Sequence, residues 1–221
     1  MTNLIKNINE AQNFIYSRGD FEEGLKSAQK AYKLRPDNLE AIYIYAIALY
    51  FNDDYKKALE LFHILENANK YLDCIYVYIA HCYSYLKENL FTGLKYINKA
   101  IKIYHYDEET TCRALLIKAE IEYKLGNIDI ALNHFLQAHR LGDSDKSLCY
   151  ISQIYFEKNQ ILKALKYFYK IFKNTNLNVK DLNLPEIKSM ILVLVDRYEI
   201  EENKHTFPQE ILDSVNKKIY S

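Results

Sequence analysis

The sequence is poor in the residues that end or bend regular secondary structure. Its 221 residues include only 5 glycines and 3 prolines, and they include no tryptophan. An all-β sandwich or barrel needs frequent turn residues, so this scarcity favours long helices instead. Neither sign of charge is in excess, because 29 basic and 29 acidic side chains balance. No global positive field therefore exists to attract nucleic acid or an anionic membrane surface.

The motifs of common catalytic, cofactor and metal sites are also missing. The glycines are scattered and form no phosphate-binding loop, the 4 cysteines form no CxxC pair, and the 6 histidines form no HExxH motif. We therefore expect no catalytic residue, no cofactor and no metal, and we expect free buried thiols in a reducing compartment.

Long apolar runs are absent as well. The stretch AIYIYAIALYF at 41–51 is the most apolar of the chain's helical patterns, yet it is shorter than the roughly 20 residues that a membrane-spanning helix needs. The N-terminal residues lack the apolar core of a signal peptide. We expect a cytoplasmic protein with no membrane insertion.

What the sequence does contain is an internal repeat. At five places a small residue is followed by apolar residues four and seven positions later. These sets begin at Gly24, Ala58, Gly93, Ala131 and Ala164, so they are spaced 34, 35, 38 and 33 residues apart. Twelve or thirteen residues before each stands a second anchor, small in four cases of five: Gln12, Ala46, Ala80, Ala119 and Ser152. Small residues let two helices approach closely, so the pattern predicts stacked helix pairs that share one core.

This pattern resembles the tetratricopeptide repeat, a helix–turn–helix unit of about 34 residues. The second repeat shows it well, with Tyr45, Ala46 and Leu49 in the first helix and Ala58 and Phe62 in the second. The resemblance implies an all-α fold, a right-handed α-solenoid of about five repeats followed by capping helices. The expected repeats are 4–36, 39–70, 73–105, 112–143 and 145–176 within a domain at 1–178, and the capping helices are expected at 179–221.

In this family the first helices line a concave groove that binds a peptide or helix of another protein. Positions three before, one after, and four or five after each small anchor lie on one helix face. The predicted peptide-binding groove contains Asn9, Asn13, Tyr16, Tyr43, Ile47, Tyr50, Phe51, Val77, His81, Tyr85, Leu116, Glu120 and Tyr123. The same counting adds Ser84, Cys149, Gln153 and Phe156 as further candidates. Tyrosines offer contact area and asparagines can bond an extended backbone, so we expect a ligand with apolar anchors.

Several functions remain open at this stage. The leading interpretation is a non-enzymatic adaptor that binds a protein segment in the groove. The alternatives are a secretion-type chaperone for an apolar segment and an assembly scaffold, a homo-oligomer or self-filled chain whose groove is covered by its own residues. The family's two-carboxylate clamp is not expected, because Ile44, Cys74 and Tyr78 stand at its polar and basic positions. The lysine stripes are interpreted as solvated helix faces rather than as nucleic-acid contacts.

Overall fold

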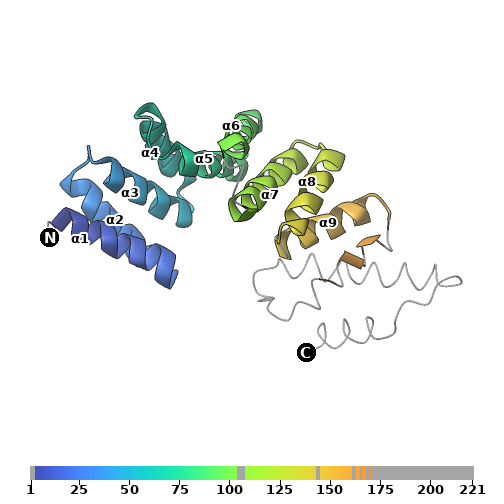
Figure 1. Ribbon diagram of the computed structural model, residues 1–221, viewed down its shortest axis with the longest axis horizontal. Coiled ribbons are helices and arrows are strands. Elements are labelled where there is room, and N and C mark those ends of the chain that lie inside the picture. The colour runs from blue at the N-terminus through green and yellow to red at the C-terminus, as the bar shows by residue number, and fades with distance from the viewer. Residues whose placement is uncertain are drawn as a thin grey trace, which may run out of the picture. The chain divides into compact units, whose positions relative to one another are not determined.

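The structure, a computed structural model, describes residues 3–103, 108–142 and 145–160, together with Lys163, Ala164, Lys166, Tyr167 and Lys170. Within these residues the chain is all-helical, with no strand, as the sequence predicted (Figure 1). The chain divides into two compact units, an N-terminal unit at Met1–Asn127 and a C-terminal unit at Ile128–Ser221. The predicted capping helices at 179–221 lie outside the described residues.

The N-terminal unit is a series of paired helices. Its elements are α1 (Asn3–Gln12), a π-helix η1 (Asn13–Arg18), α2 (Phe21–Leu34), α3 (Leu39–Phe51), α4 (Tyr55–Asn67), α5 (Leu72–Leu86), α6 (Leu90–Ile103) and α7 (Glu108–Lys124). Helices pack as the pairs α1–α2, α3–α4 and α5–α6, and each second helix also packs on the first helix of the next pair. The C-terminal unit contains α8 (Ile128–Arg140) packed against α9 (Asp145–Glu157).

Short polar side chains fix where several of these helices begin. The carboxylate of Asp20, the amide oxygen of Asn38 and the carboxylate of Asp54 each accept a hydrogen bond from the backbone N–H three residues later. Each such cap contributes about 1 kcal/mol to helix stability. At the end of η1, Gly19 adopts a left-handed conformation with φ 66°, which reverses the chain into α2. These caps and Gly19 therefore build the turns that precede α2, α3 and α4.

The small anchors of the repeat lie where helices come closest together. Ala46, Ala58 and Ala80 are fully buried. A Cβ atom added at Gly93 would lie 3.0 Å from the Cβ of Tyr83 and 3.3 Å from the carbonyl oxygen of Ala80. The pairing of α5 with α6 thus depends on a residue without a side chain at this position.

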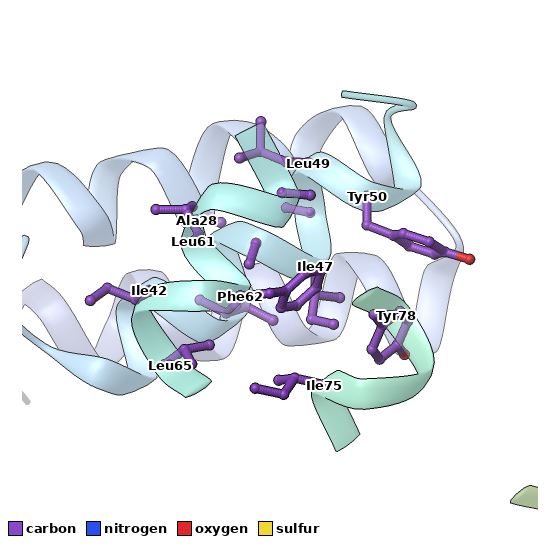
Figure 2. Close-up of a cluster of buried hydrophobic side chains, with 14 of the residues drawn as sticks. Ala28, Ile42, Ile47, Leu49, Tyr50, Leu61, Phe62, Leu65, Ile75 and Tyr78 are labelled. Atoms are coloured by element: carbon purple, nitrogen blue, oxygen red, sulfur yellow. The ribbon is translucent and has the colours of Figure 1, made fainter. Parts of the chain in front are cut away.

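The larger side chains fill the space between the helices. Ile47, Phe62, Leu65 and Ile75 belong to one buried cluster that joins α3, α4 and α5 (Figure 2). In the C-terminal unit the ring of Phe135 is fully buried and stacks on Tyr150, with the ring centroids 4.5 Å apart. Burial of such side chains supplies roughly 1.5–3 kcal/mol each, so these clusters are a main source of stability.

Helix α3, the most apolar of the helices, lies at the centre of the N-terminal unit. Eight of its 13 residues are buried. It packs against α1, α2 and α4, and its Tyr50 ring contacts Tyr78 of α5 edge-on, with the centroids 4.9 Å apart. Neighbours on several sides explain why its sequence has no polar face.

Candidate functional site

We use the name inner face for the predicted groove positions on α1, η1, α3, α5 and α7 of the N-terminal unit. The structure places these side chains in three classes of exposure. Asn9, Asn13, Tyr16 and Tyr85 are exposed; Tyr43, Phe51, Leu116 and Tyr123 are partly buried; and Ile47, Tyr50, Val77, His81, Ser84 and Glu120 are buried. In the C-terminal unit Gln153 is exposed, while Cys149 and Phe156 are partly buried.

Two of the buried side chains belong to the hydrophobic core. Ile47 lies in the cluster that contains Phe62, and Val77 lies in a second cluster with Ala114 and Ile117 of α7. They are buried because the first helices of successive pairs lie close enough for their facing side chains to pack. In this structure Ile47 and Val77 therefore stabilise the repeats rather than present a surface to a ligand.

A buried polar network connects three successive first helices. The hydroxyl of Tyr50 on α3 is hydrogen-bonded to Nδ1 of His81 on α5, and Nε2 of His81 lies 3.8 Å from Oε2 of Glu120 on α7. Tyr50, His81 and Glu120 are only 7%, 9% and 3% exposed. Burial raises the pKa of Tyr50, so its hydroxyl keeps its proton and can donate it to Nδ1. The other ring nitrogen of His81, Nε2, is the one that faces the Glu120 side chain.

Aromatic and cationic side chains cover this network. The ring of Tyr85 stacks on Tyr55 with the centroids 4.5 Å apart and the planes 1° from parallel, and it lies 4.5 Å from the imidazole of His81. The guanidinium of Arg113 lies 4.9 Å from the ring centroid of Tyr78. Lys124 donates hydrogen bonds of 2.7 and 2.8 Å to the carbonyl and hydroxyl oxygens of Ser84. The part of the inner face formed by α5 and α7 is thus closed by the protein's own side chains.

The part of the inner face formed by α1, η1 and α3 is more open. Tyr16 is 54% exposed, and its hydroxyl lies near enough to Tyr43 for each tyrosine to influence the pKa of the other. The ring of Tyr43 stacks on Tyr71, with the centroids 4.6 Å apart. Burial of the hydroxyl and the nearby Tyr78 raise the pKa of Tyr16 to about 12, so it remains a neutral donor at physiological pH. We name Asn9, Asn13, Tyr16, Tyr43 and Tyr71 the N-terminal patch.

Two features of this patch were not predicted. Tyr71 lies outside the counted groove positions, in the turn before α5, with a left-handed φ of 56°. The π-helix η1 carries Asn13 and Tyr16, and its wider turn changes the direction of the side chains that follow α1. Gly24 makes room for η1, because a Cβ there would lie 2.6 Å from Cγ1 of Ile15. No sequence signal marks the π-turn, whereas the glycine at a close contact is visible in the repeat.

Other kinds of site find no support among the residues that the structure describes. In the described ranges, no group of three or more His, Cys, Asp or Glu side chains is arranged to hold a metal ion. No described helix combines the length and apolar character needed to cross a bilayer. Cys74, Cys82, Cys112 and Cys149 form no disulfide with one another, and Cys82 and Cys112 are buried.

Comparison with known proteins connects this fold to a family. No protein-family model matches the sequence. The TPR repeat-containing protein MJ1428 of Methanocaldococcus jannaschii is 30% identical over 167 residues, which are 73% of this chain but 30% of the relative's length.

Solved structures show the same fold. TTC0263 of Thermus thermophilus, described as a thermophilic TPR protein, matches with a TM-score of 0.66 and 20% identity, covering 86% of this chain and 99% of that one. YrrB, described as a TPR protein with an unusual peptide-binding site, matches with a TM-score of 0.57 and 20% identity, over 79% of this chain and 88% of that one. PilF of Pseudomonas aeruginosa matches with a TM-score of 0.61 and 13% identity, over 96% and 97%. The repeat in the sequence, the paired helices and these relatives agree, and the chain has the fold of tetratricopeptide-repeat proteins.

Proposed function

We propose that this chain is a non-enzymatic protein–protein interaction adaptor that binds a segment of another protein on the inner face of its N-terminal unit. The observation that carries the proposal is the N-terminal patch, where exposed tyrosine and asparagine side chains lie on packed helices. The ligand is a peptide or helix with apolar anchors, as the sequence predicted. The description of YrrB as a peptide-binding TPR protein supports this use of the fold.

The chemistry of the patch suits protein recognition. Tyrosine combines a large apolar ring with a hydroxyl, and it loses little conformational entropy on binding because it has two rotatable side-chain bonds. Asn9 and Asn13 add exposed amides that can donate to and accept from a peptide backbone. The closed part of the inner face on α5 and α7 keeps the helices of the N-terminal unit in place, so binding requires little rearrangement of the fold.

The test compares partner capture by the full chain and by two variants. In the first variant, Asn9→Ala with Tyr16→Ala removes two exposed side chains of the patch while the buried network stays intact. The control is Phe91→Ala, which removes a 67% exposed aromatic side chain from the second helix α6. Captured proteins are identified by cross-linking mass spectrometry, and the crosslinks are mapped onto the chain.

The expected result is a protein crosslinked near α1 and α3 that is lost with the patch variant and kept with Phe91→Ala. Equal capture by all three proteins would overturn the assignment of the inner face. Light scattering on the purified chain distinguishes the scaffold alternative from the adaptor. A stable oligomer that the patch variant fails to form would show that a second copy of the chain covers the inner face. A partner that folds only in the presence of the chain would instead favour the chaperone alternative.

A further inference from the structure

The side chains of the N-terminal patch favour one conformation and composition of the bound segment, which the adaptor function alone does not specify. Resting on that proposed function, we propose that the patch binds a neutral, extended segment containing proline in the polyproline II conformation. The charge of the patch, its hydrogen-bonding groups and its aromatic surfaces each favour such a ligand.

The patch is electrically neutral. Its two asparagines carry no charge, and the pKa values of Tyr16, Tyr43 and Tyr71 are all raised, primarily by burial, so the hydroxyls stay protonated. The charges around it have both signs: Lys6 on α1 is paired with Glu10 at 3.8 Å, the exposed Lys70 and Asp73 flank Tyr71 in the chain, and Glu40 lies near enough to Tyr71 to raise its pKa. A strongly charged ligand would find no matching field here, which favours a segment without net charge.

One cation within electrostatic reach of the patch, Arg113, is engaged elsewhere. Arg113 influences the pKa of Tyr16, but its guanidinium lies over the ring of Tyr78 and is hydrogen-bonded to the hydroxyls of Tyr78 and Tyr50. It thus serves the closed part of the inner face. The patch itself offers amides and hydroxyls as its polar groups.

These polar groups suit a backbone with free carbonyl groups. An α-helical ligand satisfies its own backbone groups, so it would use few donors from the patch. A polyproline II segment has no internal hydrogen bonds, and its carbonyl oxygens accept hydrogen bonds from a binding surface. The exposed amides of Asn9 and Asn13 provide donors for such carbonyls.

The aromatic surfaces suit proline rings. Grooves lined by aromatic side chains bind proline-rich segments, which are already extended and therefore lose little entropy on binding. Here the stacked pair Tyr43–Tyr71 and the exposed ring of Tyr16 form such a surface. From Asn9 to Tyr16 a helix rises at most about 10 Å. At about 3.1 Å per residue, this length matches three or four residues of polyproline II, so the recognised motif is short.

The test uses a display library of random neutral peptides of about 12 residues, roughly four turns of polyproline II. The library is selected in parallel on the full chain, on Tyr16→Ala, on Tyr71→Asn and on the control Phe91→Ala. Asparagine replaces Tyr71 because it tolerates the left-handed backbone there. Circular dichroism checks that each variant is folded, and a decaproline probe then measures affinity by fluorescence anisotropy.

We expect the full chain and Phe91→Ala to enrich peptides with two or more prolines. Both patch variants should bind decaproline about tenfold more weakly than the full chain, or worse, which is the loss expected when an aromatic anchor is truncated. Enrichment of amphipathic peptides without proline, lost with the patch variants, would overturn this inference while leaving the proposed function standing. Proline-rich peptides bound equally by all variants would overturn the assignment to the patch. A library that enriches nothing would overturn the inference and, together with failed partner capture, the proposed function as well.

Discussion

Replacing Tyr50 by phenylalanine tests the buried network that closes part of the inner face. The substitution keeps the ring, which packs against Phe51, Tyr55 and Tyr78, and removes only the hydroxyl that is bonded to His81. Loss of a buried hydrogen bond whose partner stays buried costs about 1–3 kcal/mol. For a chain of this size each kcal/mol corresponds to about 2–4 °C in Tm, so the expected decrease is about 4–8 °C for a loss near 2 kcal/mol.

The assays are thermal unfolding, which gives Tm, and urea unfolding, which gives the free energy of unfolding; both are followed by circular dichroism, because the chain has no tryptophan to report on folding. The control is Tyr85→Phe, which removes a hydroxyl from an exposed side chain of the same inner face and should change the stability by less than about 0.5 kcal/mol. Equal stabilities of the two variants would refute the argument that the Tyr50 hydroxyl is a required member of the network. A stabilised Tyr50→Phe variant would show that the hydroxyl costs more in desolvation than its bond returns.

Two further predictions concern packing and ionisation. Gly24→Ala should destabilise the chain by about 1–3 kcal/mol in urea unfolding, despite the helix propensity of alanine, because the new Cβ meets Cγ1 of Ile15 at 2.6 Å. The double variant with Ile15→Ala should lose less stability than the sum of the two single losses, and strict additivity would contradict the clash. Burial raises the pKa of the Cys82 thiol from 9.0 to about 12, so the stability it contributes is complete below pH 9 and is lost as pH rises towards 12, by about 1.4 kcal/mol per pH unit. Thermal unfolding at pH 8 and pH 10 should therefore show a smaller loss for Cys82→Ala than for the unchanged chain, and equal losses would count against this ionisation.

The fold could be predicted because its signals are local and repeated. The spacing of Gly24, Ala58 and Gly93 identifies the positions where helices approach, and the structure places Ala58 and Gly93 at such contacts. Helix starts at Asn38 and Asp54 follow from ordinary capping chemistry. Each of these features depends only on the distance along one helix or across one turn, which the sequence contains directly.

The exposure of the candidate site could not be predicted in the same way. Counting positions identifies which side of a helix Tyr50 and His81 occupy, but not how near the next first helix lies. Their burial depends on the approach of α3, α5 and α7, which is set by many packing contacts together. Tyr71 was missed because it belongs to a turn with a left-handed backbone, where no helical period applies.

The division of the inner face has a consequence for how tightly a short motif can bind. A side chain that is free to rotate costs about 0.5–1.5 kcal/mol when a ligand fixes it. In the N-terminal patch, the stacking of Tyr43 on Tyr71 and the proximity of the Tyr16 hydroxyl to Tyr43 restrict these side chains before any ligand arrives. Much of that cost is then met during folding, when the surrounding core forms. A motif of three or four residues makes few contacts, so it can offset only a small entropy cost of ordering the binding surface. A surface that is already ordered therefore allows such a short segment to be recognised.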